Sequence, residues 1–184
     1  MTDHSLEMRS ENLLLRPLTE QDATERYVGW LNDAEVNRFL EVRWHHQSLA
    51  DVRSYVAGHD NVGQFVFGVF AEPDELHVGN FSIKVDENHR SAVMGVMVGD
   101  RDYWGQGIVL EARARLLDFI FSRLPVDKVS GGCYQTNVHA IFNYKRQGWE
   151  LDGIRRADRL DQGRRVDVIN FAMFREAWLD RNDP

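Results

Sequence analysis

The stretch that decides the fold is Gly99-Asp-Arg-Asp-Tyr-Trp-Gly-Gln-Gly-Ile-Val-Leu-Glu-Ala112. It follows an apolar, β-type run at residues 92–98 and leads into an amphipathic segment that predicts a helix from Gly107 to Leu124. Glycine at positions 105 and 107 permits positive φ and lets a ligand approach the backbone closely. Because the N–H groups at a helix N-terminus are unpaired and carry the positive end of the helix dipole, this turn can hold a pyrophosphate.

Other interpretations of the same turn stay open at this point. A Gly-x-Gly pair before a helix is also typical of an ordinary tight turn. The stretch lacks the Gly-Lys-Ser/Thr of a Walker loop and the third glycine of a dinucleotide fingerprint, so neither of those sites is predicted. The next β-type run is at residues 128–134, and the order strand, helix, strand predicts a βαβ unit whose two strands lie parallel.

The remaining pattern predicts a mixed α+β chain. Ser48-Leu-Ala-Asp51 resembles a capping box that opens a helix, and turn-rich segments between three central β-type runs favour an antiparallel meander. The predicted strands cover residues 13–18, 65–70, 78–85, 92–98 and 128–134, the predicted helices cover 20–31, 33–40, 48–57, 107–124 and 138–147, and a final hairpin turns near Asp161-Gln-Gly163.

The composition indicates one compact domain. With 184 residues, of which 43% are hydrophobic, the chain can bury about two thirds of the surface that its unfolded form exposes. We predict a single domain over residues 1–184, with the polar residues 1–11 as a flexible tail. The formal net charge of -7 opposes binding to nucleic acid or to a membrane surface. Arginines cluster at residues 155–165, and a solvated hairpin explains them more simply than a nucleic-acid site.

Cysteine and histidine usage indicates a reducing compartment and no metal site. The single cysteine, Cys133, cannot form an internal disulfide, and the N-terminal residues lack the apolar core of a secretory signal, so a cytoplasmic protein is expected. Cys133 lies in a β-type run and is interpreted as a small buried residue, not a nucleophile. His45 and His46 are adjacent, and no third ligand follows at a recognisable spacing.

Taken as a whole, Tyr103-Trp-Gly-Gln-Gly-Ile-Val-Leu-Glu-Ala112 resembles the coenzyme A pyrophosphate loop of the GNAT acetyltransferase superfamily, in particular its RimJ/RimL-like branch. That branch often carries Tyr-Trp-Gly-x-Gly followed by Glu-Ala. The wider superfamily has Arg or Gln where Trp104 stands and Gly or Ala where Val109 stands. The first departure is normal for the branch, and the second makes a close approach of phosphate at Val109 less favourable.

A second motif carries the same resemblance. Asn137-Val-His-Ala-Ile-Phe-Asn-Tyr-Lys-Arg-Gln-Gly-Trp149 is similar to the family signature N-x-x-A/S-x-x-x-Y-x-K-x-G-F, with Arg146 in place of the lysine and Trp149 in place of the phenylalanine. The likeness covers nearly the whole chain. It implies a mixed, mostly antiparallel seven-stranded sheet flanked by helices, with a central parallel strand pair around the coenzyme site.

The resemblance also implies acetyl-CoA as co-substrate, no metal, and roles for individual residues. Asn137 is expected to contact the pantetheine or phosphate arm, and Tyr144 is expected to protonate the departing thiolate. On helical spacing alone, Tyr144 is better explained as a partly buried helix aromatic; the glycine turn and the matching positions of Asn137 and Gly148 favour the catalytic role. The expected coenzyme contacts are Met97, Val98, Gly99, Trp104, Gly105, Gln106, Gly107, Ile108, Val109, Asn137 and Tyr144.

Attack of an amine on a thioester requires a neutral amine, a place for the developing oxyanion and a proton for the thiolate. A splayed strand at residues 97–99 is expected to supply backbone N–H groups to the oxyanion while it pairs with the pantetheine amides. No covalent enzyme intermediate is required.

The general base and the acceptor site are predicted from position. Glu41 is the preferred base, because it lies between two predicted helices in a region that covers the acceptor pocket in the resembling family. Arg43 and Trp44 are expected to bind an anionic or sugar-bearing acceptor through a charge-assisted hydrogen bond and ring stacking. A solvated, charged connection is an equally good interpretation of this segment. The other candidate bases are Asp86, Glu87, Asp100, Asp102, His45, His46 and His77.

Together these features predict an acetyl-CoA-dependent N-acetyltransferase that acts by direct attack of a primary amine on a small molecule. The phrase at residues 27–41 resembles members from bacterial surface-polysaccharide pathways, which favours a nucleotide-linked amino sugar as acceptor. Two alternatives stay open: acetylation of a protein N-terminus, as on a ribosomal protein, and a coenzyme-A-binding module without turnover. The sequence is compatible with a monomer or a homodimer.

Overall fold

The computed structural model describes residues 6–181. The βαβ order predicted around the glycine turn is confirmed, with a helix from Ile108 to Arg123 followed by a strand from Lys128 to Tyr134. The elements in chain order are β1 (Met8–Arg9), β2 (Leu13–Pro17), η2 (Glu20–Asp22), α1 (Glu25–Asn32), η3 (Glu41–Trp44), α2 (Leu49–Ala57), β3 (Gln64–Ala71), β4 (Leu76–Asp86), β5 (Ser91–Val98), η4 (Arg101–Tyr103), α3 (Ile108–Arg123), β6 (Lys128–Tyr134), α4 (Val138–Arg146), β7 (Glu150–Asp161), β8 (Arg164–Phe174) and α5 (Arg175–Leu179).

The strands form one mixed sheet in the hydrogen-bonded order β1-β2-β3-β4-β5-β6-β8-β7. β5 and β6 pair in parallel through Ser91–Val93 and Lys128–Ser130, whereas β8 pairs antiparallel with both β6 and β7. The expected seven strands are a miscount, because β1 adds an eighth by pairing antiparallel with β2. β1 lies within the segment expected as a tail, of which residues 1–5 fall outside the described part of the chain.

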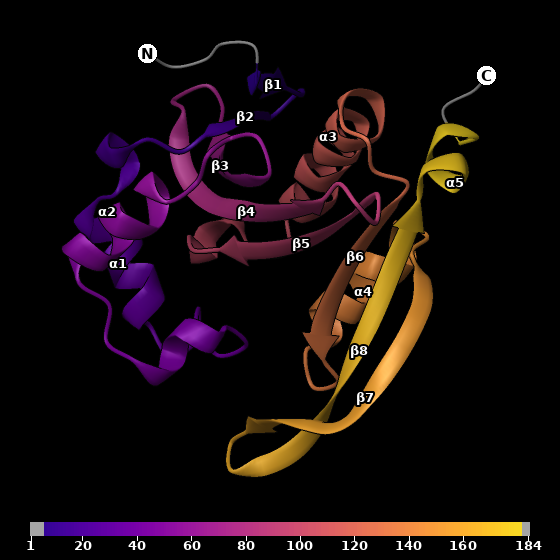
Figure 1. Cartoon of the computed structure of the whole chain (residues 1–184). Coiled ribbons are helices and arrows are strands. Elements are labelled where there is room, and N and C mark those ends of the chain that lie inside the picture. The colour runs from indigo at the N-terminus through magenta and orange to yellow at the C-terminus, as the bar shows by residue number, and fades with distance from the viewer. Residues whose placement is uncertain (1–5, 182–184) are drawn as a thin grey trace. The chain divides into compact units, whose positions relative to one another are not determined.

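Contacts divide the chain into two compact units. The first unit comprises the chain up to Ile83 together with Val96–Arg115, and the second comprises Lys84–Gly95 and the chain from Leu116 onward. Figure 1 shows α1 and α2 side by side in the first unit, and the long β7–β8 hairpin in the second. A single domain over the whole chain stays a prediction.

Two helix predictions in the first unit need correction. The helix expected at residues 20–31 is interrupted, because Thr24 is the N-cap of α1 and its side chain accepts a hydrogen bond from the N–H of Tyr27. The helix expected at residues 33–40 does not form. The Asp33 carboxylate accepts hydrogen bonds from the N–H groups of Glu35 at 2.8 Å and Val36 at 3.3 Å, and this local turn competes with helical hydrogen bonding.

The predicted capping box of α2 is confirmed. The Ser48 hydroxyl accepts from the N–H of Asp51 at 3.2 Å, and the Asp51 carboxylate accepts from the N–H of Ser48 at 2.9 Å. These two bonds satisfy donors that a helix N-terminus otherwise leaves unpaired, so the sequence fixes this helix start locally.

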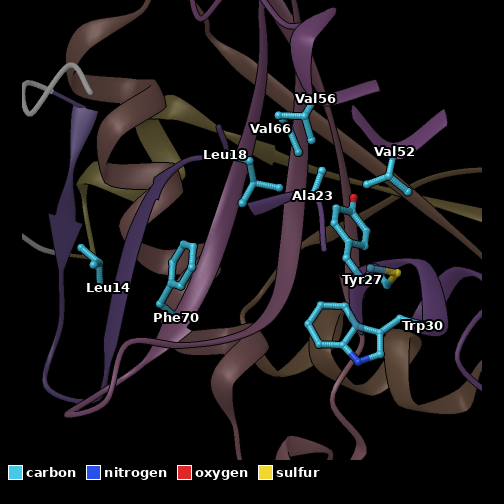
Figure 2. Packing of buried hydrophobic residues seen from close by; sticks show 10 residues of the cluster. Leu14, Leu18, Ala23, Tyr27, Trp30, Val52, Val56, Val66 and Phe70 are labelled. Carbon is cyan, nitrogen blue, oxygen red and sulfur yellow. The ribbon is translucent and has the colours of Figure 1, made fainter. Parts of the chain in front are cut away.

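The core of the first unit packs α1 and α2 against strand side chains. Figure 2 shows the rings of Tyr27 and Trp30 next to each other, with the Tyr27 hydroxyl directed away from Trp30 towards Val52 and Ala23. The buried members of this cluster are Leu14, Leu18, Ala23, Tyr27, Trp30, Val52, Val56, Val66, Phe70 and Met97. Because Met97 comes from β5, the cluster connects the helices to the strand that feeds the glycine turn.

Within residues 6–181, no helix is both long enough and apolar enough to cross a membrane.

Candidate active site

The glycine turn between β5 and α3 depends on two left-handed residues. Gly105 has φ +76° and Gly107 has φ +81°, and an added Cβ at either position would have no atom within 4 Å. The requirement for glycine is therefore conformational and not steric, since an L-residue in this region costs about 1–2 kcal/mol. The turn is exposed on the surface of the first unit.

This turn presents a row of backbone donors. The first backbone hydrogen bonds at the start of α3 are donated by Leu110 and Glu111, which bind the carbonyl of Gly107 at 2.9 and 3.2 Å. Among the described residues, none accepts a hydrogen bond from the N–H groups of residues 105–109. Consecutive N–H groups at the N-terminus of a 16-residue helix fit an anion such as the diphosphate of coenzyme A.

Side chains hold the turn in place within the first unit. The indole N–H of Trp104 donates to the carbonyl of Val98 at 2.9 Å, which ties the turn to the end of β5. Arg26 pairs with Asp100, and Arg101 pairs with Asp33 and Glu35. The Trp104 side chain is therefore a structural support of the turn as well as an expected coenzyme contact.

The end of β5 differs from the expectation for residues 97–99. The N–H groups of Gly99 and Asp100 both donate to the carbonyl of Val78 in β4, at 2.9 and 3.0 Å. The Gly99 N–H is thus already used inside the sheet, and the oxyanion donors expected at residues 97–99 stay a prediction. The parallel pairing of β5 with β6 covers only Ser91–Val93, although both strands continue beyond it.

His77 lies on β4 in an aromatic group of the first unit. Its ring stacks on Phe70 at 4.9 Å and meets the rings of Trp30 and Tyr27 edge-on at 5.1 and 5.7 Å. Nε2 donates to the carbonyl of Gly79 at 3.0 Å. Burial lowers the pKa of His77 to about 4, so the ring is neutral at pH 7 and packs within this aromatic group.

The depressed pKa of His77 predicts a pH-dependent stability. Between pH 6.5 and about 4 the unfolded chain binds a proton at this residue and the folded chain does not, so the free energy of unfolding falls as the pH drops through this window. The expected loss is about 3 kcal/mol at most. Urea unfolding from pH 7.5 to pH 4.5 measures it, and His77→Phe, which keeps an aromatic ring there, should flatten the dependence. Equal pH dependence in both proteins would contradict the prediction.

Tyr144 lies on α4 in the second unit and is 4% exposed. Its ring stacks on Phe171 of β8 with centroids 4.7 Å apart and meets Trp149 edge-on at 5.1 Å. An added Cβ at Gly131 would stand 2.3 Å from the Tyr144 hydroxyl, so this hydroxyl lies against the backbone of β6. The second motif therefore places its tyrosine hydroxyl at a strand and not in bulk solvent.

Asn137 acts as the N-cap of α4. Its side-chain oxygen accepts from the N–H of Ala140 at 3.1 Å, which accounts structurally for an asparagine at this position. Gly148, with φ +73°, ends the same helix segment in the left-handed conformation typical of helix C-termini. Both residues of the family signature thus have local structural roles, and the coenzyme contact of Asn137 stays a prediction.

The expected acceptor residues lie in and around η3. Glu41 and Trp44 are exposed, and the guanidinium of Arg43 stacks over the Trp44 ring at 4.5 Å. Asn32 anchors the end of this segment: its amide donates to the carbonyl of Gln47 and accepts from the Gln47 N–H, each at 2.9 Å. The segment between α1 and α2 is therefore held at its base, Arg43 also donates to the carbonyl of Arg38, and the Trp44 ring is exposed.

The remaining candidate bases lie at several places in the chain. Asp100 is paired with Arg26 and also caps η4, and Asp86 accepts from the N–H of His89 in the exposed β4–β5 turn, which also contains Glu87. Asp102, His45 and His46 are exposed. No group of three or more metal-binding side chains occurs within residues 6–181.

Sequence reasoning missed a buried polar pair in the first unit. The Asn80 amide of β4 donates to the Tyr27 hydroxyl of α1 at 2.7 Å, and both side chains are buried. A polar residue within the β-type run at 78–85 was the only local signal for it.

The sequence model of the acetyltransferase (GNAT) domain matches residues 12–150. The chain is similar to the uncharacterized N-acetyltransferase p20 of Bacillus licheniformis, with 22% identity over 174 residues that cover 92% of this chain and 96% of that protein. It is also similar to the uncharacterized N-acetyltransferase YoaA of Bacillus subtilis strain 168, with 19% identity over 165 residues that cover 88% and 92% of the two chains.

Solved structures share the fold. The spermidine N-acetyltransferase of Vibrio cholerae, in complex with CoA and spermine, superimposes with a TM-score of 0.83 at 19% identity, covering 92% of this chain and 99% of that chain. RimL, a ribosomal L7/L12 alpha-N-protein acetyltransferase in complex with coenzyme A, gives a TM-score of 0.82 at 20% identity, covering 91% and 97%. Because the domain match spans more than half of the residues, the chain belongs to the GNAT acetyltransferase domain family and is an N-acetyltransferase.

Proposed function

We propose that this N-acetyltransferase uses acetyl-CoA and transfers the acetyl group to a primary amine of a small molecule by direct attack. The observation that carries the proposal is the exposed turn with left-handed Gly105 and Gly107, whose N–H groups through residue 109 have no acceptor among the described residues. These donors suit the coenzyme diphosphate.

Two residues are proposed to take part in the proton transfers of this reaction. The neutral amine attacks the thioester carbonyl, the tetrahedral intermediate expels the thiolate of coenzyme A, and the amine nitrogen loses its extra proton to a base or to water. Tyr144 donates its phenolic proton to the thiolate sulfur and is reprotonated from solvent. Glu41 is proposed as the base that receives the proton of the amine.

The acceptor is proposed to be a nucleotide-linked amino sugar. Support comes from the half-buried Arg43 and the exposed Trp44, which offer a cation to phosphate and a ring face to a sugar or base. An acidic surface in this segment would instead suit the basic N-terminal region of a ribosomal protein. The alternative of a protein N-terminus has support from the shared fold with RimL, whereas the shared fold with spermidine N-acetyltransferase supports a small amine.

A panel of acceptors tests the proposal. Acetyl-CoA turnover is followed by release of free thiol with a nucleotide-linked amino sugar, a polyamine and N-terminal peptides. We expect saturable turnover with the largest kcat/KM for the sugar. Turnover on peptides alone would refute the sugar acceptor, binding of acetyl-CoA without turnover would indicate a non-catalytic module, and the absence of saturable binding in calorimetry would refute the proposal as a whole.

The glycine turn is tested in the same experiment by Gly105→Ala/Gly107→Ala. Each alanine opposes the left-handed φ by about 1 kcal/mol or more, so the double variant should weaken acetyl-CoA binding at least about tenfold. Gly163→Ala is the matched control, because Gly163 in the β7–β8 turn has φ +76° and free space around an added Cβ. An equal affinity loss in the control would show that the effect is not local to the turn.

A further inference from the structure

We propose that Asn80 binds the acceptor amine, with its side-chain oxygen accepting a hydrogen bond from the attacking nitrogen and Tyr27 fixing the orientation of the amide. This inference rests on the proposed acetyl transfer and adds a residue that selects the acceptor.

The Asn80–Tyr27 pair is unusual in its surroundings. Asn80 is 7% exposed and Tyr27 is 2% exposed, and the amide nitrogen of Asn80 lies 2.7 Å from the Tyr27 hydroxyl. In Figure 2 this hydroxyl points away from Trp30, towards the side where Val52 and Ala23 lie. A buried amide in such a place is costly unless its polar atoms have partners, so its retention calls for a reason beyond packing.

The amide nitrogen of Asn80 has a hydrogen-bond partner, whereas its amide oxygen is available to a ligand. The nitrogen is held by Tyr27, whereas no described residue donates a hydrogen bond to the oxygen. The oxygen is not among the described polar atoms that are both completely buried and unpaired, so it keeps contact with solvent. A fixed acceptor atom at the end of a buried side chain is suited to an N–H donor from a ligand.

The sheet register places Asn80 beside the end of β5. The carbonyl of Val78 accepts from the N–H of Gly99, and an added Cβ at Gly79 would stand 2.4 Å from the carbonyl oxygen of Met97. Continuing the antiparallel register by two residues sets Asn80 opposite Met97. Met97 is one of the residues proposed to contact the pantetheine arm, and it belongs to the same core cluster as Tyr27. The free amide oxygen therefore lies in the first unit near the strand proposed to hold the thioester.

The charges around this pair define the acceptor class. Tyr27 contacts the rings of Trp30 and His77, which are both uncharged at pH 7. The charges that act on His77 are those of Asp22, Arg16 and Arg26. Asp22 is paired with Arg16, and Arg26 with Asp100.

A neutral amide oxygen accepts an N–H without stabilising the ammonium form as strongly as a carboxylate does, which keeps the nitrogen lone pair available for attack. We therefore expect an acceptor with one amine and no second cationic group close to the reacting nitrogen. An amino sugar fits this description better than a polyamine.

The test measures acceptor KM in Asn80→Ala, using the most active amine of the panel. Loss of one hydrogen bond to the acceptor should raise its KM about tenfold, while the affinity for acetyl-CoA is unchanged. Tyr27→Phe, which removes only the hydroxyl, should raise acceptor KM by a smaller factor, and the double variant should be no worse than Asn80→Ala alone, because both act through one amide.

The matched control is Asn37→Ala. Asn37 is a buried asparagine of the same unit, 8% exposed, and its amide donates to the carbonyl of Leu31 at 2.7 Å. It should lose stability without a change in acceptor KM. The inference is overturned if folded Asn80→Ala has an acceptor KM within twofold of the wild type. If Asn80→Ala does not fold, the same result in Tyr27→Phe overturns it. Either result leaves the proposed function intact. If the wild-type protein does not bind acetyl-CoA, the proposed function itself is overturned.

Discussion

Replacing Tyr144 with Phe should lower kcat by about 10²- to 10⁴-fold, the usual contribution of a positioned general acid. Affinity for acetyl-CoA should not change. The fold should tolerate the substitution, because the packing of the ring between Phe171 and Trp149 is kept and only the hydroxyl is removed. Steady-state kinetics, with calorimetry of acetyl-CoA binding, separate the two quantities.

Two further variants sharpen this result. Gly131→Ala places a methyl group 2.3 Å from the position of the Tyr144 hydroxyl, so it should displace the phenol and lower kcat in the same direction. Tyr134→Phe is the control, since it removes the hydroxyl of another buried tyrosine in the same unit. If kcat of Tyr144→Phe stays within threefold of the wild type, the thiolate takes its proton from another source and the role of Tyr144 is structural.

Gly99→Ala should destabilise the protein by about 3 kcal/mol, a large effect for one methyl group. The added Cβ would stand 2.0 Å from Cδ2 and 2.2 Å from Cε3 of Trp30, so the indole must move. Trp30 is 8% exposed and packs against Tyr27 and His77, which leaves it little room. Urea unfolding at pH 7.5 measures the loss, and Trp30→Leu combined with Gly99→Ala should cost less than the sum of the two single variants.

Gly29→Ala provides the comparison for this effect. Gly29 lies within α1, and an added Cβ there would have no atom within 4 Å. Alanine in a helix interior is favoured over glycine by about 1 kcal/mol, so this variant should be as stable as the wild type or more stable. A loss below 1 kcal/mol in Gly99→Ala would mean that the Trp30 ring adjusts freely and that the close approach is not a constraint.

Local chemistry made several parts of the structure predictable. The capping box at Ser48 and Asp51 involves residues three apart, and the hairpin turn has two consecutive left-handed residues, Gln162 and Gly163, so both can be recognised in a short window. The prediction of a helix at residues 33–40 was wrong because of the Asp33 side chain. There the Asp33 side chain binds nearby N–H groups and also pairs with Arg101, a partner 68 positions along the chain that no local pattern reveals.

The glycines show most clearly which features the local sequence determines and which depend on tertiary contacts. The sequence by itself determined the turn before α3, because Gly105 and Gly107 act through their own backbone conformation, and it determined the strand–helix–strand order through periodicity. Only the tertiary structure decided that Gly99 makes room for Trp30, that Gly131 makes room for Tyr144, and that Asn80 meets Tyr27. Each of these contacts joins residues far apart in the chain, and close packing, which depends on the positions of both partners, is not encoded in either segment alone.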